Sequence, residues 1–311
     1  MTLDVLTIGV STIDLIATVG EFPRPDDRMP MRAFTRCVGG VAAVAGVALA
    51  RLGARVGYAG TVGDDDEGRQ IRAQLDEDGV DTSLLAVDAT VRTPTTIIIS
   101  DEAAGTRSIL NAPSVATFGL PARAEVAAAA RRARYVHLDH TAFPALADIV
   151  LPACRDTGTL VSLDAGVDFP EIVSYLPLID IYATTDRQLA KMTGTADLAK
   201  GLRWVREAGP RVVVATRGAL GSVALADDGS VIAAGAFNVP VVDTTGAGDV
   251  FHGALLYALL RGQRLDEALV FANAAAALSC CSIGGRPGCP SLHQVNALLS
   301  TARVAVERYQ E

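Results

Sequence analysis

Short runs of β-branched and apolar residues alternate along the chain with longer segments whose apolar residues recur at helical spacing. The runs are DVLTIGV, RVGYAGTVG, YVHLD, LVSLDAG, IDIYATT, RVVVATRG and the stretch that begins VVDTT at residue 241. Each run has the length of a strand, and the segments between them are long enough for crossover helices. This alternation predicts an α/β fold with a mostly parallel central sheet and helices on both faces.

Two segments depart from this alternation, residues 11 to about 37 and residues 92 to about 112. The second holds two β-branched runs around a glycine-containing turn, which is typical of an antiparallel hairpin. Both segments are polar on one side and apolar on the other. They suit a small β-sheet that covers a site as a lid, or equally an ordinary edge hairpin. Because no internal repeat or low-complexity linker interrupts the chain, we expect residues 1–311 to form one domain.

Composition and charge narrow the classes of partner. Half of the 311 residues are apolar, which is enough for a large core, and the net charge is −8 with scattered positive residues. A nucleic-acid partner is therefore not expected. An acid stands where a signal peptide carries positive charge, and no segment predicts a membrane span. The five cysteines form no CxxC pair, so we expect a cytoplasmic protein with free thiols.

The sequence HLDH at 137–140 suggests a metal site at first sight. It follows a strand-like run, and strand alternation sends His137 and His140 to opposite faces. We therefore expect ordinary buried or rim histidines here.

The stretch DTTGAGDVF at 243–251 combines a glycine-rich turn with the start of a helix. Apolar residues from Val250 onward follow one helical face, so a helix is expected to begin near Gly248. The turn Gly246-Ala247-Gly248 would then present unpaired N–H groups at the positive end of the helix dipole, which is an anion site. The spacing matches neither a dinucleotide-binding fingerprint nor a Walker A loop.

Asp249 directly adjoins this turn and would repel a bound phosphate. Its presence is explained if it faces a hydroxyl group that must lose its proton to attack that phosphate. We expect the helix dipole to keep Asp249 ionised. The alternative is that Asp249 is only a favourable acid in the first helical turn and the glycines only a tight loop.

The motif DTTGAGD resembles the C-terminal signature of the ribokinase-like (PfkB) carbohydrate kinases. Further motifs resemble that family in the same order, namely VGGVAAVAGVALARLG, VGDDDEGRQIRAQLDEDGVDT, ATRGALG and FANAAAALSCCSIGGRPGCPS. The resemblance extends from near residue 5 to near residue 300. It implies a ribokinase-like fold and a kinase that uses ATP and Mg²⁺ to phosphorylate a small-molecule sugar, with any requirement for a monovalent cation left open.

The resemblance also implies roles for single residues. Asp249 would be the catalytic base, and the turn 246–249 would supply the anion hole through the N–H groups of Ala247, Gly248 and Asp249. Asp14 would accept hydrogen bonds from sugar hydroxyls, unless it is only a polar strand end, and the sugar would approach Gly39 and Gly40. The expected ATP-binding residues are Thr185, Gln188, Thr216, Gly218, Gly221, Asn273 and Gly284.

Two positions depart from the family pattern. Thr185-Asp186-Arg187-Gln188 replaces the usual Asn-x-x-Glu, so the usual carboxylate link to magnesium is missing and Asp186 or Asp164 is expected to substitute. Val44 replaces the Asn that closes the Gly-Gly signature. The valine either removes a side-chain contact to the substrate or simply packs a helix. This weakens the inference of ribose as the substrate.

A subgroup shares several of these departures. VGDDD, DTTGAGDVFHGAL with His252, and the ending GGRPG resemble the bacterial 6-deoxy-6-sulfofructose kinases. In that subgroup a lid cation, an Asn of the second lid strand and an Arg hold the sulfonate; Arg28 and Asn111 match the first two, whereas Thr141 stands in place of the Arg. With Asp139, these residues form the expected substrate side, and Arg107 or His140 could compensate for Thr141. A ketose or ketose derivative is therefore expected, with an uncharged ketohexose or a sugar phosphate still open.

Two other functions are alternatives to a sugar kinase. One is a catalytically idle sugar sensor, which the missing Glu favours and Asp249 disfavours. The other is a nucleoside or ribose kinase, for which Phe22, Phe34 and Phe118 are the aromatic candidates near the lid. The lid strands also predict a homodimer that pairs through the lid.

Overall fold

The computed structural model describes residues 3–111, 123–141, 143–167 and 170–309. Phe118 and residue 112, which were considered above, lie outside these ranges. Within them, no helix has the length and apolar character needed to cross a membrane.

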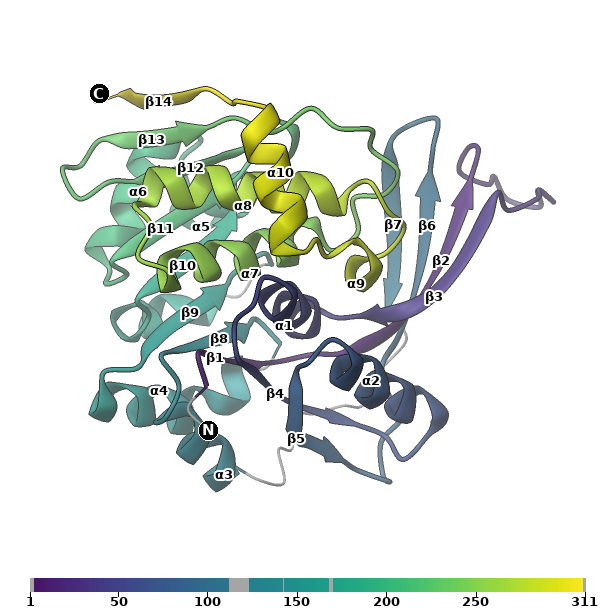
Figure 1. Cartoon of the computed structure of the whole chain (residues 1–311), viewed down its shortest axis with the longest axis horizontal. Helices are drawn as coiled ribbons and strands as arrows, with labels where there is room; N and C mark the ends of the chain where they lie inside the picture. Colours follow the sequence, from purple (N-terminus) through teal and green to yellow (C-terminus); the bar gives the residue numbers. More distant parts are fainter. Residues whose placement is uncertain (1–2, 112–122, 142, 168–169, 310–311) are drawn as a thin grey trace.

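A ten-stranded sheet forms the centre of the molecule (Figure 1). Its strands, in spatial order, are β14 (Val306–Tyr309), β13 (Val231–Ala234), β12 (Ser222–Leu225), β11 (Val212–Thr216), β10 (Ile181–Thr185), β9 (Leu160–Asp164), β8 (Tyr135–Asp139), β1 (Val5–Ile8), β4 (Val56–Val62) and β5 (Asp81–Val87). From β11 to β5 all neighbours are parallel, whereas β12, β13 and β14 add an antiparallel edge. The predicted mostly parallel α/β fold is thus confirmed.

Helices bury both faces of this sheet. One apolar cluster joins the sheet to α1 (Val41–Arg51), α2 (Asp66–Glu77), α7 (Ala247–Leu260), α8 (Leu265–Ser279) and α10 (Leu292–Thr301). A second cluster joins the opposite face to α3 (Arg123–Ala130), α4 (Phe143–Thr157), η1 (Pro170–Leu178), α5 (Asp186–Thr193) and α6 (Leu198–Glu207). Two short turns, η2 (Gly218–Leu220) and α9 (Gly285–Gly288), lie in connecting segments. This two-sided burial explains why the central strands are almost uniformly apolar.

The strand expected at VVDTT is absent, because residues 241 and 242 belong to an irregular segment. The N–H groups of Val242 and Asp243 donate to the carbonyl of Cys280, at the end of α8, and not to a neighbouring strand. Val241 and Val242 are exposed. β-branched residues therefore gave a misleading strand signal here, since the backbone hydrogen bonds of the segment are made with a helix end.

A separate four-stranded sheet projects from the body (Figure 1). Its order is β3 (Ala33–Gly39), β2 (Thr12–Val19), β6 (Thr95–Asp101) and β7 (Thr106–Asn111). The two outer pairs are antiparallel, as expected, but the central pair β2–β6 is parallel. We call this sheet the lid sheet. Its register places Asp14, Thr96 and Asn111 side by side on one face, and Leu15, Ile97 and Leu110 on the other.

Candidate active site

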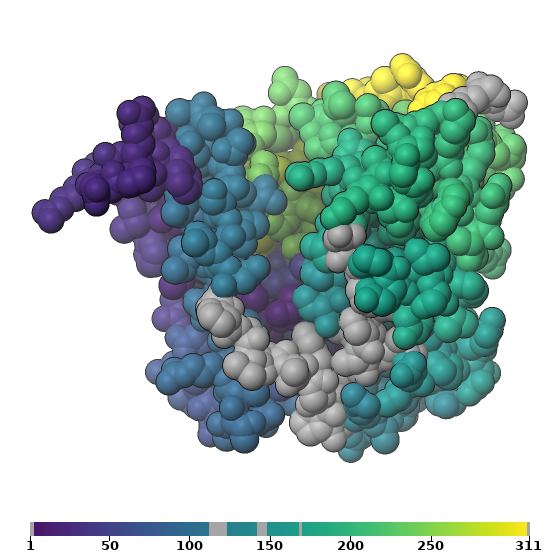
Figure 2. Space-filling model, turned by 180° about the vertical axis from the view of Figure 1, so that it is seen from behind, coloured from purple at the N-terminus to yellow at the C-terminus, as the bar shows by residue number. Residues whose placement is uncertain are grey.

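A cavity of about 630 Å³ lies between the lid sheet and the carboxyl ends of the parallel strands. The face of the lid sheet that carries Asp14, Thr96 and Asn111 is turned to this cavity, and we call it the inner face. Figure 2 shows the recess between the lid strands β6 and β7, in blue, and the body. Ligands of open α/β sheets bind at this edge. The cavity includes these predicted residues in its lining: Asp14, Gly40, Asn111, Thr141, Asp164, Thr185, Thr216, Gly246, Gly248 and Asp249.

The turn before α7 has the geometry that the glycines predict. The helix begins at Ala247, one residue before the predicted start, and its N-cap Gly246 has φ 76°, which is left-handed. A Cβ on Gly246 would lie 2.5 Å from Cα of Gly285, whereas a Cβ on Gly248 would meet no protein atom within 4 Å. Gly246 is thus required by the fold, and Gly248 leaves space that a ligand can use.

The amides of this turn are not equivalent. The N–H of Ala247 donates to the carbonyl of Thr244 at 3.3 Å, so it is already used within the protein. Those of Gly248 and Asp249 lie in the first helical turn, where no intrahelical acceptor exists. The predicted anion hole therefore narrows to Gly248 and Asp249.

The two glycines make a matched pair for mutation. Gly248→Ala is expected to melt no lower than wild type, because its methyl group enters open space on a helix, yet to lower kcat/KM about tenfold by crowding a phosphoryl group. Gly246→Ala is expected to destabilise the protein, because of its φ and its contact with Gly285. Thermal melts and steady-state kinetics of both variants test this. Loss of stability in Gly248→Ala with unchanged kinetics would contradict the proposed open site.

The environment of Asp249 differs from the expectation. Burial, followed by the negative charges of Asp164, Asp139 and Asp14, raises the pKa of Asp249 well above its ordinary value, and Arg107 only partly opposes this. The helix dipole favours the ionised form, but burial and several neighbouring carboxylates oppose it. A raised pKa brings a carboxylate closer to the basicity that a general base needs.

Asp14 faces the cavity from the lid strand β2. It is buried, and its carboxylate accepts a hydrogen bond of 2.6 Å from Thr12 Oγ1. Burial raises the pKa of Asp14 to about 6, and the hydrogen bond from Thr12 counters this only in part. A Cβ on Gly39 would lie 1.9 Å from Asp14 Oδ2, so Gly39 makes room for this carboxylate and does not itself line the cavity.

Arg107 brings positive charge to the cavity from the lid strand β7. Its guanidinium donates to Thr244 Oγ1 in the turn before α7, which joins the lid to the anion turn. Among the described residues that line the cavity, Arg107 alone is an arginine or lysine. Asn111, on the same strand, accepts a hydrogen bond of 3.3 Å from Thr96 Oγ1.

Asp164 is paired inside the protein. Its Oδ2 lies 2.7 Å from His252 Nδ1, and its Oδ1 accepts the N–H of Gly166 at 2.9 Å. The two side chains are within ion-pair distance, and the contact is an ion pair when the His252 ring is protonated. Burial alone would raise the pKa of Asp164, but His252 and the nearby His137 and His140 lower it below its ordinary value.

The residues expected to hold magnesium do not come together. Asp164 lines the cavity, but the Asp186 carboxylate accepts the N–H of Arg187 and does not line it. The described part of the chain contains no cluster of three His, Cys, Asp or Glu side chains that could hold a metal. A nucleotide-bound Mg²⁺ fits such a site, since it needs one or two carboxylates and takes its other ligands from phosphates and water.

His137 is buried, and its Nδ1 lies 3.1 Å from Ser162 Oγ.

Comparison with known proteins decides the family. Residues 2–292 match the model of the pfkB family carbohydrate kinases. The chain belongs to the PfkB family.

The relatives of this PfkB kinase act on different acceptors. It is 29% identical to the aminoimidazole riboside kinase of Salmonella typhimurium (97% of this chain, 96% of the relative). It is 30% identical to the 5-dehydro-2-deoxygluconokinase of Shouchella clausii (97% of both chains). Arabidopsis thaliana ribokinase, solved with ribose and ATP, superposes with a TM-score of 0.82 at 23% identity, covering 97% of this chain and 100% of that one. The chain is thus a phosphotransferase with an alcohol acceptor, of the sugar or nucleoside class.

Several residues predicted for the PfkB kinase site lie outside the cavity lining. Besides Gly39, Ala247 and Asp186, they are Arg28, Asp139, Gln188, Gly218, Gly221, Asn273 and Gly284. Arg28 is exposed in the loop between β2 and β3. Gln188 lines a neighbouring pocket of about 320 Å³, and its N–H is capped by Thr185 Oγ1 at 3.1 Å. Gly218 is the first residue of η2 and Gly221 follows its last; both lie beyond Thr216, and their contact with ATP stays a prediction.

Two of these residues have structural partners that account for them. The Asp139 carboxylate accepts the N–H of Val10 at 2.7 Å and that of Thr141 at 2.9 Å, so it fixes the loop after β1 and is fully buried. The Asn273 amide donates to the carbonyls of Ala234 and Gly235, which ties α8 to the end of β13. The structure therefore does not support direct ligand contacts by Asp139 or Asn273.

Sequence reasoning missed Asp243, the first residue of DTTGAGD. Its Oδ1 accepts the N–H and hydroxyl of Thr245, and its Oδ2 accepts the N–H of Gly284 at 2.9 Å. The D-x-T spacing is a recognisable Asx-type turn, so the local half of this role was open to prediction. Its link to Gly284, 41 residues away, was not open to prediction.

Val44 is buried and packs beside Gly246 and Gly285, which favours the helix-packing interpretation of that position.

Proposed function

We propose that this chain transfers the γ-phosphoryl group of ATP to a primary hydroxyl of a ketose or ketose derivative. The observation that carries the proposal is the convergence of three groups on one cavity. Asp249 and the free amides of α7 lie on one wall, and Asp14 and Asn111 of the lid sheet lie on another. An acid, an anion site and hydroxyl-binding groups are the parts that phosphoryl transfer to a sugar requires.

In the reaction, Asp249 orients the acceptor hydroxyl and takes up its proton as the new O–P bond forms. The bond between the γ-phosphorus and the bridging oxygen of ADP breaks, and the amides of Gly248 and Asp249 stabilise charge on the transferred group. Arg107 adds a positive charge to the same region. Asp164 would hold Mg²⁺, which neutralises charge on the phosphates when it is bound. Thr185, Thr216 and Thr245 line the side expected to take ATP.

The lining of the cavity favours a sugar over a nucleoside. Among its described residues are Thr12, Thr61, Thr95, Thr96 and Thr141, but no Phe, Tyr or Trp. A nucleobase is commonly held by stacking on an aromatic ring, whereas sugar hydroxyls need hydrogen-bond partners. Phe22 and Phe34 are exposed and do not line this cavity.

A panel of acceptors tests the proposal. ADP release is measured with 6-deoxy-6-sulfofructose, fructose, fructose 6-phosphate, ribose and adenosine, together with the thermal shift that each compound causes. A ketose with the highest kcat/KM supports the proposal, and a preference for adenosine or ribose rejects it. Binding without turnover by any compound would instead identify a sugar sensor.

We further propose that two copies pair through the outer face of the lid sheet. Phe34 of β3, Ile97 of β6 and Leu110 of β7 are each about half exposed there. Leu15 and Ala17 of β2 continue the same face. An apolar sheet face of this kind is stabilised when a second copy covers it. Sedimentation velocity should give twice the 32.2 kDa monomer mass, and a monomer at micromolar concentration would exclude this pairing.

A further inference from the structure

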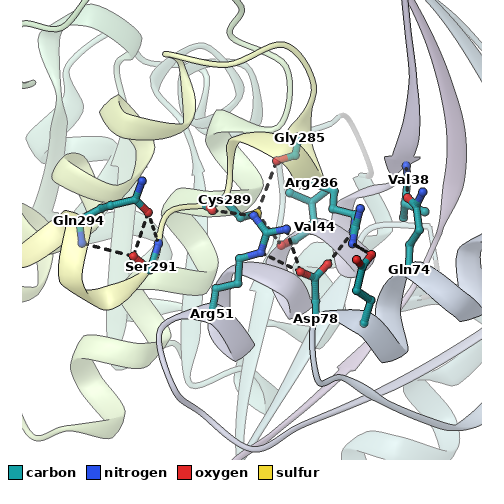
Figure 3. A network of polar contacts seen from close by, with 11 residues as sticks. Val38, Val44, Arg51, Gln74, Asp78, Gly285, Arg286, Cys289, Ser291 and Gln294 are labelled. Atoms are coloured by element: carbon teal, nitrogen blue, oxygen red, sulfur yellow. Dashed lines mark hydrogen bonds and ion pairs between the residues drawn. The ribbon is translucent and has the colours of Figure 1, made fainter.

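A partly buried ionic network joins α1, α2 and α9 outside the cavity (Figure 3). Arg286 donates through Nε to Asp78 Oδ2 and through Nη2 to Glu77 Oε2, both at 2.6 Å. The other oxygen of Asp78 accepts from Arg51 Nε at 2.8 Å. The Arg286 side chain is only 13% exposed and that of Asp78 only 7%. A carboxylate shared by two guanidinium groups at this burial has a fixed geometry, unlike an exposed ion pair.

This network holds α9 at both ends. Arg286 lies in its first turn, and the carbonyl of Cys289, directly after its last residue, accepts from Arg51 Nη1 at 2.8 Å. Asp78 follows the last residue of α2 and is therefore a fixed point on the body of the molecule. The position of α9 is thus set by α1 and α2.

The segment held in this way supports the anion turn directly. The N–H of Gly284 donates to Asp243 Oδ2, the carboxylate that also binds Thr245. A Cβ on Gly246 would lie 2.5 Å from Gly285 Cα, so the backbone at Gly285 leaves no room for a side chain at Gly246. Any displacement of residues 284–286 would therefore move the turn that carries Gly248 and Asp249.

The same segment also contacts the inner face of the lid sheet. Ile283 packs against the small apolar cluster of Ile16, Cys37 and Ile98. A Cβ on Gly284 would lie 2.7 Å from Cys37 Sγ. Residues 283–286 are therefore packed between the lid and the anion turn, and Arg286 fixes them to the body.

We infer that Arg286 is a positioning residue for phosphoryl transfer, acting through residues 283–285 on the anion turn and the lid. It does not line the cavity, and its inferred effect rests on the proposed function. Its ion pairs fix the distance between the turn amides and the sugar held by the lid. A misplacement of about 1 Å in such a site can cost up to about 10²-fold in rate.

The test compares Arg286→Met with a matched change, Arg55→Met, which removes an exposed ion pair to Asp4. We expect Arg286→Met to lower kcat about tenfold at a temperature well below its melting point, with the KM values for ATP and sugar changed less than about threefold. Arg55→Met should keep wild-type kcat. Arg286→Lys keeps the charge but only part of the bidentate contact, so it should recover part of the lost rate.

The outcomes separate this inference from the proposed function. A lower melting temperature with unchanged kcat would show that Arg286 only stabilises the fold, and would overturn the inference. An equal fall of kcat in Arg55→Met would do the same. If Arg286→Met does not fold, Arg286→Lys is decisive: a two- to fivefold lower kcat supports the inference and a wild-type kcat overturns it. A wild-type protein that phosphorylates no sugar would instead refute the proposed function itself.

Discussion

Asp249→Asn is expected to lower kcat by about 10²-fold or more while leaving the affinity for ATP within about twofold of wild type. The amide keeps the shape of the side chain but cannot take up the proton of the acceptor hydroxyl. Steady-state kinetics and calorimetric titration with ATP measure the two quantities separately. Asp227→Asn, at a fully exposed aspartate, is the matched control and should behave as wild type. Unchanged turnover in Asp249→Asn would remove Asp249 from the mechanism.

The same variant should be more stable than wild type at neutral pH. Because the folded-state pKa of Asp249 is raised, the folded protein binds this proton more tightly than the unfolded chain. The stabilising contribution is complete below the unfolded pKa and is lost as the pH rises through the folded pKa. At neutral pH this carboxyl group is therefore less favourable for folding than a neutral side chain of the same shape, and Asn removes that cost. A rise in melting temperature of about 1–2 °C per kcal/mol recovered is expected, with no rise in Asp227→Asn.

The pH dependence of turnover follows from the same shift. The base form of Asp249 is lost as the pH falls through its raised pKa, so kcat should fall at a higher pH than an ordinary aspartate would give. Asp14, with a pKa of about 6, loses its charge in the slightly acidic range, and this should appear in the KM for the sugar. A pH profile of kcat that stays flat down to about pH 4 would argue against Asp249 as the base.

Arg107→Met is expected to lower kcat by about 10²- to 10³-fold, since it removes the arginine that reaches from the lid to the anion turn. Arg107→Lys should recover part of that rate, because a lysine keeps the charge but not the planar fork. Arg32→Met is the lid control, since Arg32 forms an exposed ion pair with Glu102. If Arg107→Met instead raised only the KM for the sugar, Arg107 would bind an anionic group of the acceptor.

The sequence predicted those parts of the site that depend on local pattern. The start of α7, the turn that carries Asp249, and the lid segments with Asp14 and Asn111 follow from periodicity, glycine spacing and alternation. The resemblance to the family signatures assigned these segments to one kinase site. What the sequence could not supply was the pairing of residues distant in the chain. His252 with Asp164, and Arg286 with Asp78, are such pairs.

Some residues were predicted correctly in position but not in partner. Asp139 ends its strand at the ligand-binding edge, yet its carboxylate is turned to the backbone of Val10. Asn273 lies on the expected helix, yet its amide binds carbonyl groups of the neighbouring segment. A polar residue at a functional edge can serve the backbone or the ligand, and only its neighbours in space distinguish the two. The valines at 241 and 242 illustrate the same limit for a strand signal.

The parallel pairing of β2 with β6 has a consequence for how the molecule is assembled. Parallel neighbours need a crossover connection, and here the chain between them builds β3, α1, β4, α2 and β5 before it returns. The four lid strands are therefore not one contiguous cassette that could be excised or transplanted. The contacts between β2 and β6 span a long stretch of sequence, so we expect the two halves of the lid sheet to join late in folding, after the N-terminal half of the central sheet has condensed.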